Sequence, residues 1–215
     1  MDMKSEVTGR LVSARVFPVF FVSLLVALVG VYAGSLLPPR WVMPLALIEV
    51  GMILFAMLFR RRHSVGYPFL FTFTFISGMT LAPIILAYTS TIGASEVLNA
   101  FCVTVFAFGG AALYASRSKA DFRFLGGFLF IGLLALLAMG VVSIFSPFSS
   151  TAAMVYSLLG IAIFIGYTLF DVNRLTRYGV APEDVPMVVL SLYLDFVNLF
   201  LFVLRFFGVN LRSRN

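Results

Sequence analysis

The chain has 215 residues, of which 61% are hydrophobic and only 11% charged, and its mean hydropathy is +1.07. Soluble domains have roughly 45–50% apolar and about 25% charged residues, so the composition excludes a soluble globular protein and indicates a polytopic membrane protein. The net charge of +6 comes from lysines and arginines at the ends of apolar stretches, which is typical of topology signals and excludes nucleic acid as a partner.

Seven apolar segments are each long enough to cross a bilayer, which requires about 20 residues in a helix. Clusters of proline, glycine, serine and arginine separate them. We therefore predict an all-α integral membrane protein that forms a single domain over residues 1–215. The predicted spans are residues 16–37, 41–59, 67–88, 98–116, 124–146, 151–170 and 186–207.

The first span resembles a signal peptide, because Lys4, Arg10 and Arg15 precede its apolar run. That run covers 18 residues, 16–33, whereas the apolar part of a signal peptide usually has about 7–15. We interpret the segment as a membrane helix. It also carries a GxxxG pair, Gly30 and Gly34, which permits close contact with another helix.

Basic residues are concentrated in the N-terminal tail and in the loops after the second, fourth and sixth spans. The opposite loops contain only Arg40, so the N-terminus is predicted to be cytoplasmic. We expect the membrane to be the cell membrane of a prokaryote. Arg205, Arg212 and Arg214 do not fit, because seven spans place them on the outer side. The alternative is a re-entrant last segment, but its 22 residues, 186–207, are enough to cross.

Three acidic residues lie within or beside the spans: Glu49, Asp171 and Asp195. An aspartate at the centre of a membrane helix costs roughly 2.5–3.5 kcal/mol, and such residues usually serve protons, cations or a buried partner. Ser191, Asp195 and Asn198 are separated by four and three residues, so they share one face of the seventh helix. That helix is expected inside the bundle.

Asp171 ends the sixth predicted span on the cytoplasmic side, and Asp195 lies about 13 Å into the seventh from Pro186. If these helices are neighbours, the two carboxyls share a proton, which favours a pH sensor. Carboxylate oxygens also suit Ca²⁺. The alternative interpretation is structural, with Asp195 paired to Arg60 or Arg205 and Glu49 accepting hydrogen bonds.

Several segments resemble the transmembrane Bax-inhibitor-motif family, and its small bacterial members most of all. They are LSLYLDFVNLFLFVLRFFG at 190–208, SGMTLAP at 77–83, LALIEV at 45–50 before the arginine run, and the region around Asp171. The resemblance covers essentially the whole chain. It implies seven helices, arranged as two three-helix layers around a central C-terminal helix, and a pH-sensitive calcium leak controlled by two aspartates.

Carried onto this chain, the resemblance implies that Asp171 and Asp195 are the pH sensor and gate and that Arg60 is the latch. Glu49 would line the ion pathway, where we also expect the polar residues Ser191 and Asn198. Asp171, Asp195 and Glu49 would bind Ca²⁺ transiently. One departure is Phe170, which stands where the family often has tyrosine; Tyr167, one turn earlier, is a candidate substitute.

We therefore expect a calcium leak channel, not an enzyme, with calcium ions, protons and membrane lipid as its partners and with no cofactor. The oligomeric state stays open, a monomer being the simplest case. A proton-coupled Ca²⁺/H⁺ exchanger is the main alternative. An intramembrane aspartyl protease is disfavoured because the residues before Asp195 are Leu192-Tyr193-Leu194 rather than the GxG of such enzymes.

Other site chemistries are excluded by residue counts. The chain has one cysteine, Cys102, and one histidine, His63, which rules out an internal disulfide, a Cys/His zinc cluster and a bis-His haem. A retinal Schiff base in the seventh span is excluded as well, because the only lysines are Lys4 and Lys119.

Overall fold

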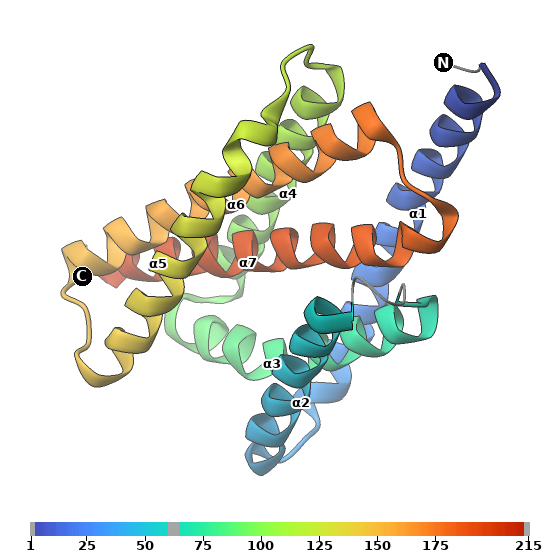
Figure 1. Cartoon of the computed structure of the whole chain (residues 1–215). Helices are drawn as coiled ribbons and strands as arrows, with labels where there is room; N and C mark the ends of the chain where they lie inside the picture. The colour runs from blue at the N-terminus through green and yellow to red at the C-terminus, as the bar shows by residue number, and fades with distance from the viewer. Residues whose placement is uncertain (1–2, 60–64, 213–215) are drawn as a thin grey trace. The chain divides into compact units, whose positions relative to one another are not determined.

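The structure is a computed structural model that describes residues 3–59 and 65–212. Within these ranges it contains seven α-helices, each long and apolar enough to cross a membrane, together with three short 3-10 helices in the connections (Figure 1). The α-helices are α1 (Met3–Ser35), α2 (Val42–Phe59), α3 (Tyr67–Ile92), α4 (Ala94–Arg117), α5 (Leu125–Phe145), α6 (Ser150–Tyr178) and α7 (Val185–Arg212). The predicted all-α membrane fold is confirmed.

The largest difference that bears on the site is at the end of α6. The apolar run suggested that the helix ends at Phe170, but α6 continues to Tyr178, so Asp171 lies two turns inside it. The apolar run shows which part of a helix lies in the hydrocarbon of the membrane. The helix itself continues until a residue that favours termination is reached. Here Gly179 follows with φ +69°, a left-handed conformation that glycine adopts without steric cost and that commonly terminates helices.

Within the predicted single domain, the chain divides into two compact units. The first comprises Met1–Ala87 and Tyr178–Tyr193, and the second comprises Tyr88–Arg177 and Leu194–Asn215. Helix α7 is therefore divided, with its first residues in the first unit and those from Leu194 onward in the second. Asp171 and Asp195 both belong to the second unit, and Glu49 belongs to the first.

In the first unit, α1 and α3 pack in direct backbone contact through glycines. A Cβ atom on Gly30 would collide with the carbonyl oxygen of Phe75, and one on Gly78 would collide with that of Ala27. A Cβ on Gly34 would come within 2.7 Å of the Met79 Cα. The close contact predicted for the GxxxG pair in α1 is confirmed. Small residues serve this purpose in membranes because they let helix backbones approach each other.

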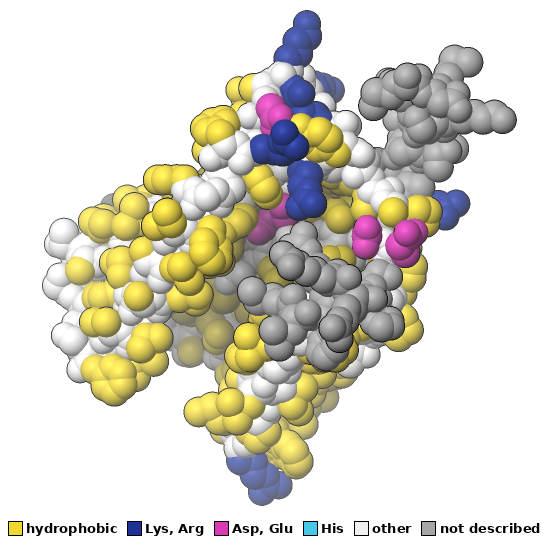
Figure 2. All heavy atoms as spheres, in the orientation of Figure 1, with side chains coloured by type: hydrophobic (Ala, Val, Ile, Leu, Met, Phe, Trp, Pro, Cys, Tyr) yellow, Lys and Arg dark blue, Asp and Glu magenta, His cyan; other side chains and the backbone are white. Residues whose placement is uncertain are grey.

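In the second unit, aromatic rings fix the later part of α7. Phe196 packs edge-on against Phe101 and Phe108 of α4, with ring centroids 6.0 and 5.4 Å away, and Phe202 stacks on Phe164 of α6 at 5.7 Å. Helix α7 is the most enclosed of the seven: 61% of the residues in its apolar stretch are buried, against 11% for α5. Hydrophobic side chains also dominate much of the visible surface (Figure 2), as expected for helices that face lipid.

Candidate functional site

The carboxyl group of Asp195 is enclosed within the protein. The residue is 5% exposed, and its Oδ2 atom is buried without any hydrogen-bond partner among the described residues. Buried polar atoms are paired in the great majority of cases, so each unpaired one requires an explanation. The next residue along the helix, Phe196, packs against Phe101 and Phe108 of α4.

Asp171 on α6 interacts electrostatically with Asp195 on α7, and Tyr167 interacts with both carboxyls. Tyr167 and Asp171 are four residues apart and therefore lie on one face of α6. The structure thus brings together two acidic groups and one phenol in the second unit. Sequence spacing had indicated Tyr167 as the nearest hydroxyl in place of the tyrosine expected at Phe170.

Asn173, which sequence reasoning missed, anchors the end of α6 that carries Asp171. Its side chain is 1% exposed and makes three hydrogen bonds to the backbone of the last turn of α4 and of the α4–α5 connection. The Nδ2 group donates to the carbonyls of Ala115 at 3.3 Å and Ala120 at 3.1 Å, and Oδ1 accepts from the Phe122 N–H at 3.1 Å. No periodicity identifies such a residue, because its partners lie more than 50 positions away.

In the first unit, Glu49 on α2 is the centre of a separate polar cluster. The Thr80 hydroxyl of α3 donates a hydrogen bond of 2.6 Å to Glu49 Oε2. The Tyr193 side chain is fully buried, its hydroxyl donates to the Thr74 carbonyl at 3.5 Å, and it lies close enough to Glu49 for an electrostatic interaction. The interpretation of Glu49 as a hydrogen-bond acceptor is confirmed.

The remaining predicted site residues are less closely associated with the pair. Asn198 lies one turn beyond Asp195, and its Nδ2 group donates to the Leu194 carbonyl at 2.7 Å. Ser191 is partly buried one turn before Asp195. Arg60, the predicted latch, lies outside the described residues.

The predicted calcium ligands do not form one cluster. Within the described ranges, no three histidine, cysteine, aspartate or glutamate side chains are grouped closely enough to hold a metal ion. Asp171 and Asp195 remain a pair, while Glu49 is engaged with Thr80 in the other unit. Contact partners that are distant in sequence decide where each of these carboxyls lies.

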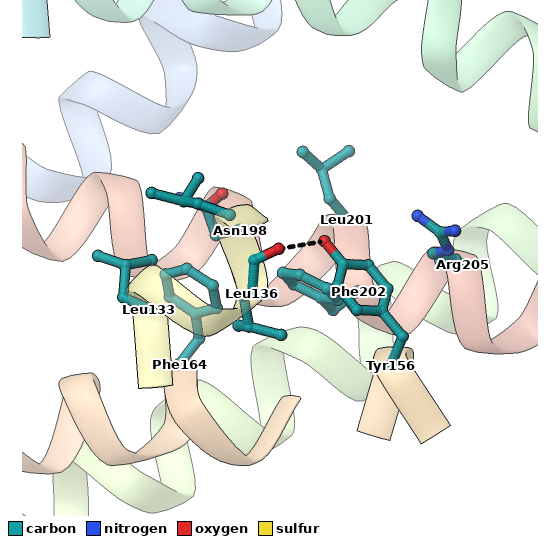
Figure 3. Close-up of a pocket in the computed structure, with 9 residues that line it drawn as sticks. Leu133, Leu136, Tyr156, Phe164, Asn198, Leu201, Phe202 and Arg205 are labelled. Carbon is teal, nitrogen blue, oxygen red and sulfur yellow. Dashed lines mark hydrogen bonds between the residues drawn. The ribbon is translucent and has the colours of Figure 1, made fainter. Parts of the chain in front are cut away.

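A cavity of about 240 Å³ lies between α5, α6 and α7 of the second unit (Figure 3). Four leucines and two phenylalanines line it, and its polar residues are Tyr156, Asn198 and Arg205. The Tyr156 hydroxyl donates to the Leu136 carbonyl at 3.2 Å. The guanidinium of Arg205 lies over the Tyr156 ring, 4.7 Å from its centroid, and 5.7 Å from that of Phe148.

These contacts exclude one interpretation made from the sequence, the ion pair between Asp195 and Arg205. The two residues are ten positions apart on one helix, about 15 Å along its axis. Arg205 instead packs against aromatic rings, and no ion pair between it and Asp195 is present. Spacing along a helix identifies a shared face but does not bring residues three turns apart into contact.

Comparison with known proteins gives consistent results. A family model described as "Inhibitor of apoptosis-promoting Bax1" matches residues 9–212. Bax inhibitor 1 of Schizosaccharomyces pombe is 37% identical over 145 residues, which cover 67% of this chain and 52% of the yeast protein. This chain therefore spans about half the length of that relative.

Two further relatives are covered over more of their length. Protein lifeguard 4 of Mus musculus is 33% identical over 168 residues, or 78% of this chain and 68% of the mouse protein. Inner membrane protein YbhL of Escherichia coli is 29% identical over 173 residues, or 76% of this chain and 72% of the bacterial protein.

Proposed function

Because this chain belongs to the Bax inhibitor family of multi-pass membrane proteins, we propose that it is a pH-sensitive calcium leak channel. Asp171 and Asp195 act as its proton sensor and gate. The observation that carries the proposal is the burial of Asp195, whose Oδ2 atom has no hydrogen-bond partner in the described structure while Asp171 interacts with it electrostatically.

The chemistry follows from the repulsion of two carboxylates in one low-dielectric site. When both are ionised they repel each other strongly, and a proton shared between them removes that repulsion. Loss of the proton therefore changes the force between α6 and α7. A carboxyl group binds a hard divalent cation as the ionised carboxylate, so proton release and Ca²⁺ passage are linked at the same atoms.

The other predicted residues complete this mechanism. Arg60 is proposed to latch the ionised pair by supplying the positive charge that Ca²⁺ would otherwise provide. Glu49, Ser191 and Asn198 are proposed to offer oxygen atoms along the ion pathway. With its Thr80 hydrogen bond, Glu49 holds one carboxylate oxygen in a defined direction. We further propose that the protein has no enzymatic activity and no resident cofactor.

The test is calcium release from liposomes that contain the purified protein and a Ca²⁺-sensitive dye, measured between about pH 6 and pH 8. The wild type is expected to show a leak that depends on pH. An Asp171→Asn/Asp195→Asn variant should lose this dependence, because amides do not titrate. Asp184→Asn is the matched control, since it removes one exposed carboxylate outside the spans.

An unchanged pH response in the double variant would refute the gating role of the pair. A Ca²⁺/H⁺ exchanger couples Ca²⁺ movement to proton movement, whereas a leak does not. If an imposed proton gradient drives Ca²⁺ up the Ca²⁺ concentration gradient, the protein is an exchanger and not a leak channel. Release that only follows the Ca²⁺ gradient supports the leak.

A further inference from the structure

The charge on Arg205 has no counter-ion in the described parts of the chain. Its side chain makes neither an ion pair nor a hydrogen bond there, and its recorded contacts are those with Tyr156 and Phe148. Stacking on aromatic rings uses the face of the guanidinium and leaves its five N–H donors, which point outward in the plane, available. A partly buried arginine in an apolar helix bundle is costly unless an anion satisfies these donors.

The position of Phe148 shows the membrane depth at which this charge lies. Phe148 is in the short connection between the end of α5 at Phe145 and the start of α6 at Ser150. A connection between two membrane spans is at the membrane–water interface, since irregular backbone exposed to lipid is not tolerated within the hydrocarbon. Arg205 is therefore at the level of the phospholipid headgroups on that side.

The cavity extends from Arg205 toward the interior of the membrane. Most of its lining is leucine and phenylalanine, which favours apolar contents. Leu137, on the α5 side, is 58% exposed, so the cavity opens at α5, which is the least covered by protein of the three helices that line it. In a bilayer that opening faces acyl chains.

We propose that this cavity is a binding site for an anionic phospholipid. The phosphate accepts charge-assisted hydrogen bonds from the Arg205 guanidinium, and an acyl chain lies along Leu137. The chain also contacts Leu133 and Leu201, which Figure 3 labels. Charge complementarity selects an anionic over a zwitterionic headgroup, because Arg205 repels the positively charged ammonium group of a zwitterionic lipid. The proposal does not depend on calcium transport.

The experiment is native mass spectrometry of the purified full-length protein in detergent, titrated with phosphatidylglycerol or with phosphatidylcholine. The wild type should retain phosphatidylglycerol about tenfold more tightly than phosphatidylcholine, a difference of the size expected for one charge-assisted contact. Arg205→Gln should remove this preference. Arg40→Gln is the matched control, because it removes an exposed arginine from the connection between two other spans and should retain the preference.

A second variant tests the same lipid site if Arg205→Gln does not fold. Leu201→Trp fills the cavity, leaves Arg205 in place, and should reduce phosphatidylglycerol binding by a similar factor. Equal binding of both lipids by the wild type, or unchanged binding in both variants, would overturn the site. Competition by inorganic phosphate would overturn it too, because the bound species would then be a free anion rather than a lipid.

Discussion

The Thr80 hydroxyl on α3 donates a hydrogen bond of 2.6 Å to Oε2 of Glu49 on α2, so an acidic residue inside a predicted span is held by a neighbouring helix. Thr80 also donates to the Ser77 carbonyl at 2.9 Å. A hydroxyl supplies one proton, so these two acceptors compete for it. The shorter contact is the one to the carboxyl.

Replacing Thr80 by valine should lower the stability of the first unit. Valine has nearly the same shape but no hydroxyl, so the Glu49 carboxyl loses a partner at a cost of about 1–3 kcal/mol. Thermal unfolding in detergent measures this. Thr72→Val, at an exposed position of the same helix, should unfold like the wild type. Equal unfolding of the two variants would show that the hydrogen bond contributes nothing.

Replacing Tyr167 by phenylalanine should move the midpoint of the proposed pH-dependent calcium leak upward. A phenol that can donate to a carboxylate favours its ionised form, so the pair without this group keeps its proton to higher pH. The liposome assay provides the midpoint. Tyr114→Phe removes a hydroxyl from an exposed tyrosine of α4 and should leave the midpoint in place. If both variants behave like the wild type, Tyr167 does not replace the hydroxyl missing at Phe170.

Replacing Asn173 by alanine should destabilise the end of α6. Three backbone groups, Ala115 O, Ala120 O and Phe122 N, lose their partner. Leaving such groups unsatisfied should cost about 2–4 kcal/mol in total. Amide hydrogen exchange in the connection between α4 and α5 should accelerate accordingly. Asn99→Ala removes an exposed asparagine that bonds only weakly to Glu96, at 3.4 Å, and should not change this exchange.

Replacing Gly78 by alanine should separate α1 from α3. The added methyl group collides with the Ala27 carbonyl, which belongs to a helix backbone and cannot rotate away. A loss of about 1–3 kcal/mol is expected, as for other overpacked positions. The control is Gly51→Ala in α2, where an added Cβ meets nothing within 4 Å. Because alanine has a higher helix propensity than glycine, this variant should be as stable as the wild type or slightly more stable. A Gly78 variant as stable as the Gly51 variant would contradict the close contact.

Much of the candidate site could be anticipated from residue spacing, and the reason is helical geometry. Tyr167 and Asp171 had to share a face of the sixth helix, as did Asp195 and Asn198 on the seventh, whatever their neighbours. The role of Asn173 could not be anticipated, because hydrogen bonds to a distant connection leave no periodic signal. The ion pair of Asp195 with Arg205 was wrong because two residues ten positions apart on one helix share a face but do not touch.

An all-α membrane protein with seven spans follows from the amino-acid sequence alone, because hydrocarbon thickness and backbone hydrogen bonding leave an apolar segment of about 20 residues few alternatives. The tertiary structure alone decided how far α6 continues past its apolar run, that Asp195 Oδ2 is buried without a partner, and that Thr80 meets Glu49. It also decided that Arg205 stacks on Tyr156 above an apolar cavity. These facts depend on the packing of side chains from different helices, which hydropathy and periodicity do not encode.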